Sequence, residues 1–420
     1  MNRLFDWRWS CLTVIAASIP AAAAAKAPAG VYYWEADRLV VAKALLEKDG
    51  DAQGMDQLRK AAERLREEAD DCLSRGPYSV TDNDGVPPSG DKHDYISYSV
   101  YWWPDPKQPD GLPFIRRDGY TNEEQRAKGD REALKRMIED AEALSLAYFF
   151  FGREEYAQHA RKLLRTWFID PKTKMNPHLQ YAQAVLGREE GRGSGIIDAR
   201  AFVELLDAVA LLEDAGAIPA DDQKALHEWF EAYKKWLLTS DYGDDERHAT
   251  NNHGTWYSAQ TARVALYVGD TVTAKELVAE ARERLSDAVA RDGRQSEELK
   301  RTRSLHYSMF HLAAFAYLAR FGEALDVDLW RDKEEAKSRF ERGLDFVTPY
   351  LLDQQKWPYE EIREYALSPQ IVQLLYMAHA RYQRPAYREA LAKADRSEPD
   401  RDWSALLFAP MVKTGPKAAH

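Results

Sequence analysis

The chain has 420 residues, of which 45% are apolar and 30% charged, an ordinary composition for a globular protein large enough to bury a substantial core. Its formal net charge is −11, which repels polyanions at long range and argues against a nucleic-acid partner. An acidic substrate would therefore need a local cationic groove that overrides this field.

The first 25 residues have the pattern of a secretory signal peptide. Arg3 and Arg8 precede an apolar run over residues 11–25 that ends in alanines, as in a basic n-region, a short h-region and a small-residue cleavage site. The run is too short to span a bilayer well, and no later stretch is apolar enough to do so. We predict cleavage near Ala25, a single domain over residues 26–420, and a periplasmic or secreted location.

The rest of the chain alternates helical periods with short breakers such as Gly152 and Pro171. We expect paired helices over residues 132–151 and 154–168, 201–215 and 221–238, 256–268 and 274–290, 305–321 and 333–352, and 369–382 and 386–394. Strand-like alternation is scarce, and no fixed repeat period is present. This pattern predicts an all-α protein built as an incomplete (α/α) toroid of antiparallel helical hairpins, in preference to an open solenoid.

Three loop-rich regions interrupt the helices, at residues 79–129, 172–200 and 241–254. Long loops inside a compact domain are usually functional or disordered. These are rich in aromatic residues, which argues against disorder. We therefore expect them to surround the mouth of the toroid.

The third region leads into Asn251-Asn252-His253. Breaking the C–H bond next to a carboxylate requires donors that neutralise the carboxylate, a base for the proton and an acid for the leaving oxygen. Either amide suits the first task, and His253 suits a base. The alternative is structural: Thr250 or Asn251 could cap the following helix, with His253 exposed in its first turn.

A second cluster, Lys300-Arg301-Thr302-Arg303, leads to Tyr307. Tyr307 can donate a proton, or act as a base if cations lower its pKa from about 10. Arg303 shares a helix face with Tyr307. Arg301 is about 240° away and can reach the phenol only from the preceding loop. The two arginines could instead form a solvated face, and Tyr307 could be a core residue.

Further residues suit a groove that binds an acidic polymer, because arginines and amides hold carboxylates and aromatic rings stack on sugars. The stretch at residues 101–103 could alternatively be core packing. The candidate groove residues are Asn251, Arg303, Tyr95, Trp102, Trp103, Gln180, Gln183, Arg188, Arg192 and Tyr257.

The histidines follow no zinc-type spacing, and the glycine-rich stretch at residues 187–195 lacks the lysine and the preceding strand of a phosphate-binding loop. The many carboxylates form no distinct pair. We therefore expect neither a metal nor another cofactor.

The chain resembles the alginate-lyase superfamily of polysaccharide lyases. Three segments carry the resemblance: His93-Asp94-Tyr95 through Asp105-Pro106 with Arg117-Asp118-Gly119 following; Asn251-Asn252-His253; and Thr302-Arg303-Ser304-Leu305-His306-Tyr307.

The resemblance implies an α/α toroid and metal-independent β-elimination of a uronic-acid polymer. It implies that Asn252 neutralises the carboxylate, that His253 is a base or a neutralising partner, and that Tyr307 is the acid, with the role of base open to Tyr307 as well. It also implies a site arginine six or seven residues before the tyrosine. Of Arg301 and Lys300, which stand there, we favour Arg301.

Stereochemistry leaves the substrate open. Mannuronate and glucuronate differ only at C2, so one tyrosine could act as base and acid on either polymer. Guluronate is inverted at C5, so base and acid would need opposite faces, for example His253 and Tyr307. We expect cleavage of β-1,4-linked polyuronates, either alginate or glucuronan, with unsaturated uronate ends. The alternatives are an α/α-toroid glycoside hydrolase, which needs two opposed carboxylates, and a non-catalytic helical-repeat protein that binds polysaccharide.

Overall fold

A computed structural model describes residues 26–47, 55–331, 335–397 and 402–408. The predicted signal peptide, residues 1–25, lies outside the described residues.

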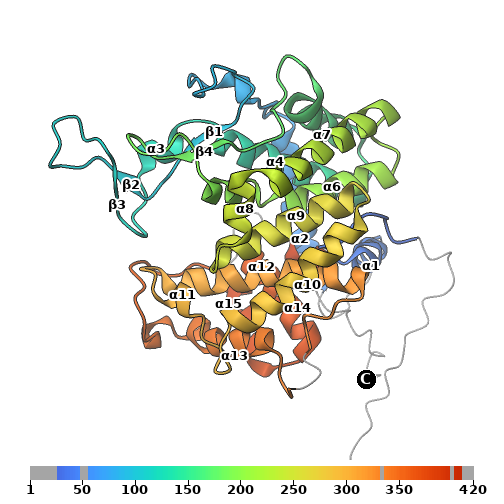
Figure 1. The fold of residues 1–420 in the computed structure, drawn as a ribbon. Helices are drawn as coiled ribbons and strands as arrows, with labels where there is room; N and C mark the ends of the chain where they lie inside the picture. Colours follow the sequence, from blue (N-terminus) through green and yellow to red (C-terminus); the bar gives the residue numbers. More distant parts are fainter. Residues whose placement is uncertain (1–25, 48–54, 332–334, 398–401, 409–420) are drawn as a thin grey trace, which may run out of the picture.

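Helices dominate this part of the chain (Figure 1). The α-helices are α1 (Ala36–Leu46), α2 (Met55–Cys72), α3 (Glu123–Ala127), α4 (Arg131–Phe151), α5 (Glu154–Leu164), α6 (Phe202–Asp214), α7 (Ala220–Thr239), α8 (Asp241–Arg247), α9 (Asn252–Tyr267), α10 (Thr271–Ala288), α11 (Ser296–Leu299), α12 (Ser304–Leu325), α13 (Arg339–Leu352), α14 (Pro369–Tyr382), α15 (Pro385–Ser397) and α16 (Ser404–Phe408). The strands are β1 (Ile96–Tyr98), β2 (Trp102–Trp103), β3 (Ile115–Arg116) and β4 (Tyr181–Ala184).

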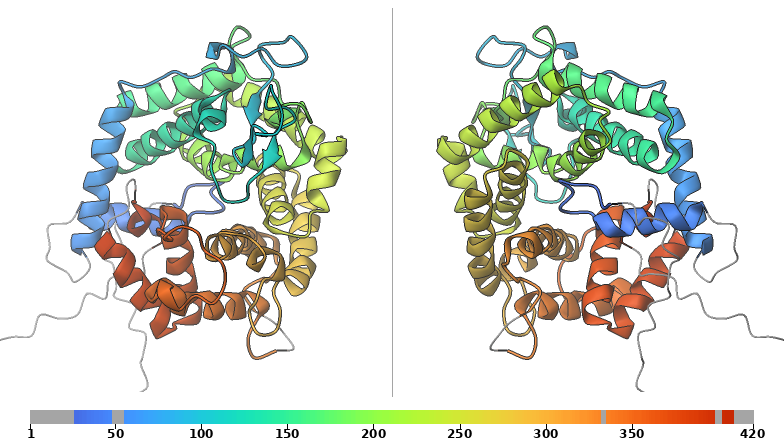
Figure 2. Two further views of the ribbon diagram at one scale, coloured as in Figure 1. Left: turned by 90° about the vertical axis from the view of Figure 1, so that its left-hand side faces the viewer. Right: turned by 90° about the vertical axis from the view of Figure 1, so that its right-hand side faces the viewer.

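The helices form a ring of antiparallel hairpins (Figure 2). Its inner layer is the series α4, α6, α9, α12 and α14, in which each helix packs against the next. The second helix of each hairpin, from α5 to α15, lies outside, and α16 bridges α14 to α1 and α2. The predicted fold class, an incomplete (α/α) toroid, is confirmed.

Burial explains why the two layers have different sequences. The outer helix α5 buries one stripe, at Tyr156, Ala157, Ala160, Leu163 and Leu164, as an amphipathic helix should. The inner helix α9 is buried from residue 254 to residue 267 without a break, because it has neighbours on every side. An inner helix can therefore carry polar groups only where they find partners inside the protein.

The predicted helix pairs are present, with shifted ends. Helix α9 begins four residues earlier than expected, at Asn252, so the amide–imidazole motif belongs to its first turn. Helix α13 begins at Arg339 rather than at residue 333. The expectation of a continuous loop over residues 241–254 is wrong, because Asp241–Arg247 forms α8, whose first turn is capped by the Ser240 hydroxyl.

The N-terminal segment closes one end of the ring, where Figure 2 shows it crossing the interior. Asp207 on α6 accepts the backbone N–H groups of Tyr32, Tyr33 and Trp34 at 2.8–3.0 Å. Arg263 on α9 donates to the same carboxylate at 3.0 Å, and both charged side chains are fully buried. A buried carboxylate keeps its charge only with such partners, so this ion pair anchors the segment across the ring.

The short strands lie in the loop-rich part of the chain. Strands β2 and β3 form an antiparallel hairpin that projects from the ring (Figure 1), and β1 pairs in parallel with β4. The β2–β3 hairpin carries Trp102 and Trp103.

Two further observations concern Cys72 and the membrane. Cys72 is fully buried at the end of α2 and forms no disulfide. Within the described residues, none of the helices combines the length and the apolar character needed to cross a bilayer.

Candidate active site

The two sequence motifs begin the neighbouring inner helices α9 and α12. The Thr255 hydroxyl in the first turn of α9 lies 2.8 Å from Nε2 of His311 in the second turn of α12, so both helices start at the same end of the ring. Helix N-termini carry partial positive charge, so this end of the ring favours an anion. The site is assembled around these two termini.

Tyr307 occupies the centre of the site. Its hydroxyl donates a hydrogen bond of 2.7 Å to the hydroxyl of Tyr101, which stands just before β2. The guanidinium carbon of Arg301 lies 3.7 Å from the centre of the Tyr307 ring. Arg301 reaches the ring from the turn between α11 and α12, the approach expected from its spacing. A cation stacked on a ring in this way is attracted to the ring face.

Asp118 holds Arg301 in this position. Its carboxylate accepts hydrogen bonds from Arg301 Nε at 3.1 Å and from Arg301 Nη2 at 2.7 Å. It also accepts from the backbone N–H and hydroxyl of Thr302 at 3.2 and 3.0 Å. The neighbouring Gly119 has a φ of +74°, and a Cβ there would lie 2.4 Å from Thr302 Oγ1, so the close approach of the two segments requires glycine.

His253 is oriented by Glu246 on α8. The distance from His253 Nδ1 to Glu246 Oε1 is 2.6 Å. The Glu246 side chain is 5% exposed and that of His253 is 23% exposed, so the carboxylate lies behind the imidazole. The Asn251 side chain caps α9 by accepting from the backbone N–H of His253 at 3.1 Å. The helix-cap interpretation of Asn251 is therefore correct, and the cap coexists with a partly accessible imidazole.

Asn252 is turned inward. Its Nδ2 donates to Glu298 Oε2 at 2.9 Å, its backbone N–H donates to Glu298 Oε1 at 2.7 Å, and the residue is fully buried. The backbone N–H of Arg301 donates to the Glu298 carbonyl at 3.1 Å, so a continuous set of contacts joins Asn252 to Arg301 and Tyr307. Direct contact between the Asn252 amide and a substrate would require the Glu298 pair to open. Its assignment as the neutralising group stays a prediction.

Arg303 lies beside Glu361. Its Nε lies 3.8 Å from Glu361 Oε1, and Glu361 also accepts the backbone N–H groups of Leu305 and His306 at 2.8 and 3.1 Å. Glu361 therefore caps α12, and Arg303 pairs with the cap. The expectation that Arg303 would stabilise a tyrosinate through their shared helix face is not supported, since Arg301 stacks on the phenol instead.

The electrostatics of the site favour a protonated Tyr307. Burial raises the pKa of the phenol well above its ordinary value, and the neighbouring Tyr101 raises it further, while Arg301 opposes both. Burial alone would raise the pKa of Asp118, but the Arg301 hydrogen bonds and charge outweigh it and lower that pKa to about 2. Burial raises the pKa of Glu298, against the opposing hydrogen bonds from Asn252. Burial, followed by nearby arginine charges, lowers the pKa of His306 to about 3, which keeps this ring neutral.

Several of the predicted groove residues meet at β2. The guanidinium carbons of Arg188 and Arg192 lie 5.2 and 6.0 Å from the centre of the Trp102 ring. Arg192 donates to the Ser99 hydroxyl at 2.8 Å and to Gln183 Oε1 at 3.1 Å. Two arginines beside a half-buried indole form a surface that suits carboxylates and sugar faces.

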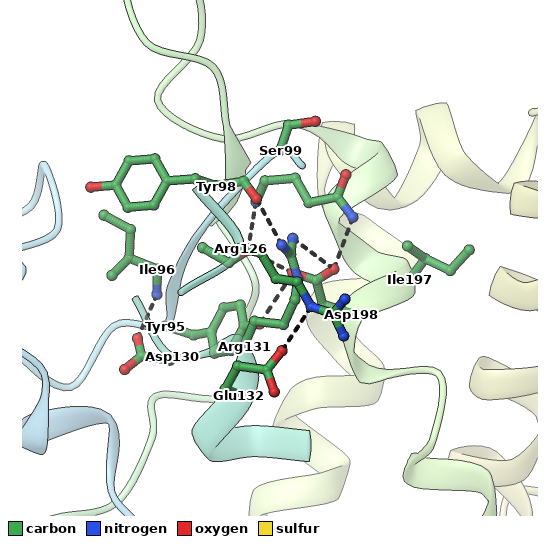
Figure 3. A network of polar contacts seen from close by, with 12 residues as sticks. Tyr95, Ile96, Tyr98, Ser99, Arg126, Asp130, Arg131, Glu132, Ile197 and Asp198 are labelled. Carbon is green, nitrogen blue, oxygen red and sulfur yellow. Dashed lines mark hydrogen bonds and ion pairs between the residues drawn. The ribbon is translucent and has the colours of Figure 1, made fainter. Parts of the chain in front are cut away.

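A buried ion-pair network supports this surface (Figure 3). Asp198 accepts from Arg131 at 3.1 Å, from the Tyr95 hydroxyl at 3.1 Å and from Gln183 Nε2 at 2.8 Å. Gln183 has a φ of +53°, a left-handed conformation uncommon for a residue with a side chain. Its amide therefore links the buried Asp198 to Arg192 at the surface.

Four other predicted groove residues have different positions. Tyr95 is fully buried on Asp198, and Tyr257 is buried with its hydroxyl on the Leu237 carbonyl at 2.8 Å, so their assignment as groove residues is corrected to core packing. Trp103 lies on the hairpin with Arg117 5.4 Å from its ring centre. Gln180 is half-buried just before β4, and the structure shows no contact between it and the site.

The main omission of the sequence analysis was the set of carboxylates behind the site. Asp118, Glu246 and Glu298 hold Arg301, His253 and Asn252 respectively. Tyr101, the partner of Tyr307, was also missed, although it begins the aromatic run at residues 101–103. Asp118 lies in a stretch already singled out, at Arg117-Asp118-Gly119, whereas no sequence signal marks Glu246.

Among the described residues, one group has the composition of a metal site: Glu68 and Cys72 on α2 with Asp140 on α4. Arg75 contacts all three, with Nη2 2.8 Å from the Cys72 sulfur and 3.4 Å from Asp140. Burial raises the pKa of the Cys72 thiol to about 12, so the thiolate form that a metal needs is disfavoured. The arginine already supplies the positive charge in this cluster.

Comparison with known proteins identifies relatives over most of the chain. The sequence model of the alginate lyase family matches residues 79–357. A solved structure of an alginate lyase from Bacteroides ovatus is 35% identical, with a TM-score of 0.83, over 90% of this chain and 99% of that one. No curated protein sequence matches the chain.

More distant structures share the fold. Alginate lyase A1-III from Sphingomonas species A1 is 15% identical, with a TM-score of 0.58, over 91% of this chain and 96% of that one. A variant of A1-III in complex with a tetrasaccharide is 14% identical, with a TM-score of 0.58, over 93% of this chain and 98% of that one.

Proposed function

Because the chain belongs to the alginate lyase family and is a polysaccharide lyase, we propose that it cleaves β-1,4-linked polyuronates by β-elimination at the Tyr307 site. The observation that carries the proposal is the position of Tyr307: its buried phenol lies beneath Arg301, and contacts through Glu298 join Arg301 to Asn252, the neighbour of His253. Family membership favours a lyase over the glycoside hydrolase and the non-catalytic binding protein.

The reaction needs three functions. A base takes the proton from C5, the C–H electron pair forms the C4–C5 double bond, and the C4–O bond breaks with its oxygen taking a proton from an acid. We assign the acid to Tyr307, whose raised pKa keeps its proton available for the leaving oxygen. Arg301 lowers the energy of negative charge that develops on the substrate and on the phenol.

The base depends on the configuration at C5. In mannuronate and glucuronate, H5 and O4 have the same relative arrangement, so one group on that side can act on both atoms. For Tyr307 to do so, its phenol must first lose a proton to solvent; the tyrosinate then takes H5 and returns that proton to O4. In guluronate H5 lies on the opposite face, where His253 would have to accept it. The surface of Arg188, Arg192 and Trp102 would hold neighbouring uronates. These steps use side chains of the chain itself and assign no task to a metal.

The test is substitution of Tyr307 by Phe, assayed on mannuronan, guluronan and glucuronan. The unsaturated product absorbs in the ultraviolet, so initial rates can be followed directly. We expect Tyr307→Phe to fold normally and to lose at least about 100-fold in kcat, because proton transfer alone contributes roughly 100- to 10,000-fold. Retained turnover would reject the assignment, and products with no double bond from the unchanged enzyme would reject the lyase reaction.

We further propose export to the periplasm or the medium, on the basis of the basic, apolar and alanine-rich pattern of residues 1–25. Mass spectrometry of protein recovered from an exporting host should give a mature chain that begins at Lys26. An intact N-terminus would contradict the proposal.

A further inference from the structure

Glu246 lies behind His253 and touches no group that the proposed reaction uses apart from this imidazole. The distance of 2.6 Å between Nδ1 and Oε1 is that of a strong hydrogen bond to a charged partner. An ionised carboxylate has only acceptor sites, so Nδ1 must carry the proton of this bond. In the neutral imidazole, the other nitrogen, Nε2, then has a free lone pair.

We propose that Glu246 is a positioning residue that fixes His253 in the Nδ1–H tautomer and thereby presents Nε2 as a proton acceptor. The inference rests on the proposed function, because it assigns His253 a task in β-elimination. Glu246 acts through the imidazole and does not touch the substrate.

The fold holds Glu246 rigidly. Helix α8 packs tightly against the last turn of α7, because a Cβ on Gly243 would lie 1.9 Å from the Leu237 carbonyl oxygen. On the other side, a Cβ on Gly193 would lie 2.9 Å from the Tyr242 carbonyl oxygen, so the segment after β4 also presses on α8. Neither neighbour leaves space for α8 to shift.

His253 is held from its own side as well. Asn251 Oδ1 accepts its backbone N–H at 3.1 Å, and Asn252 Nδ2 and backbone N–H are fixed on Glu298. These hydrogen bonds therefore fix the backbone of the first turn of α9 at Asn252 and at His253. With both backbones fixed, the short Nδ1–carboxylate bond determines the orientation of the ring.

The most direct test is nitrogen-15 NMR of the mature protein labelled at histidine. The chain has 10 histidines, and the signals of His253 can be assigned as those that disappear in His253→Gln. We expect the neutral ring to carry its proton on Nδ1 and to leave Nε2 unprotonated. A neutral ring with its proton on Nε2 would overturn the proposal.

Kinetics provides the second test, on whichever polyuronate shows His253-dependent turnover. The variant Glu246→Gln should lower kcat on the order of 10- to 100-fold, the loss seen when partners that orient metal-bound histidines are removed. KM should stay within about threefold, and Glu246→Asp should recover part of the rate. In Glu246→Gln the NMR signals should show a mixture of tautomers, because an amide can face the ring with either end.

Glu280→Gln is the matched control. Glu280 pairs with Arg247, the residue next to Glu246, at 3.2 Å and does not contact His253. If α8 only needs to stay in place, both variants should lose activity alike and keep the tautomer, and the proposal would be refuted. The NMR result does not depend on turnover, so it remains informative even if no polyuronate yields an unsaturated product, the outcome that would reject the proposed function instead.

Discussion

Replacing Asp118 by Asn tests whether catalysis depends on how Arg301 is held. The carboxylate accepts two side-chain hydrogen bonds from Arg301 and two hydrogen bonds from Thr302. Asn retains one oxygen and presents an N–H₂ group where the other stood, so at least one charge-assisted bond is lost. Arg301 should then leave its place over the Tyr307 ring for part of the time.

The expected decrease in kcat follows from the loss of this hydrogen bond. A hydrogen bond to a charged group contributes about 1.5–3 kcal/mol. If the lost hydrogen bond stabilises the transition state by this amount, kcat should decrease roughly 10- to 150-fold, since each 1.4 kcal/mol corresponds to a factor of ten. KM should change less, because Asp118 does not face the substrate.

The pKa of about 2 sets the pH range of the effect. A carboxyl whose folded-state pKa is depressed contributes stability above its ordinary pKa of about 3.9 and loses that contribution as the pH falls through its folded-state value. The ratio of the rates of the unchanged enzyme and Asp118→Asn should therefore be constant above about pH 5.

The assay is the initial rate of ultraviolet gain over a range of substrate concentrations and pH values. Asp110→Asn is the control, because Asp110 is an exposed residue in the same hairpin that bonds only the backbone N–H of Leu112 at 3.0 Å. A folded Asp118→Asn variant with unchanged kcat would show that Arg301 needs no such partner, and the reasoning would fail.

Two further predictions concern the neighbours of Asp118. Tyr101→Phe removes a group that raises the pKa of Tyr307. The alkaline limit of activity, where the acid loses its proton, should therefore move to lower pH. An unchanged or higher limit in the pH–rate profile would contradict this prediction. Arg192→Gln should raise KM roughly tenfold with little change in kcat, the effect of removing one carboxylate contact worth about 1.4 kcal/mol, whereas a fall in kcat alone would show that Arg192 acts on the chemical step. Arg192→Lys should recover only part of the affinity, since lysine cannot make a bidentate contact with a carboxylate.

The sequence predicted the helical hairpins because their apolar residues recur with the period of the α-helix, a local property. The four-residue error at the start of α9 arose because polar residues at 252–255 interrupt that pattern, although inside the ring they find partners such as Glu298 and His311. Helix α8 was missed because its seven residues are too short and too polar to show a period. Tertiary contacts decide both cases.

The sequence predicted only part of the candidate site, again because tertiary contacts decide the rest. The residues to which we assign chemistry, Tyr307 and His253, stand out by type and position. The carboxylates that orient them do not, because Asp118 is 183 residues from Arg301 and Glu298 is 46 residues from Asn252. Only the folded ring brings these pairs together, and nothing in the sequence distinguishes these carboxylates from acidic residues on the surface.

The anchored N-terminal segment determines how a long chain molecule can meet the enzyme. Tyr33 stacks on Tyr317 with ring centres 3.8 Å apart, ten residues beyond Tyr307 and thus about 15 Å further along α12. The N-terminal segment therefore crosses the end of the ring opposite the candidate site. A polymer bound at Tyr307 would not thread through the ring, so we expect both fragments of a cut strand to leave from the Tyr307 side.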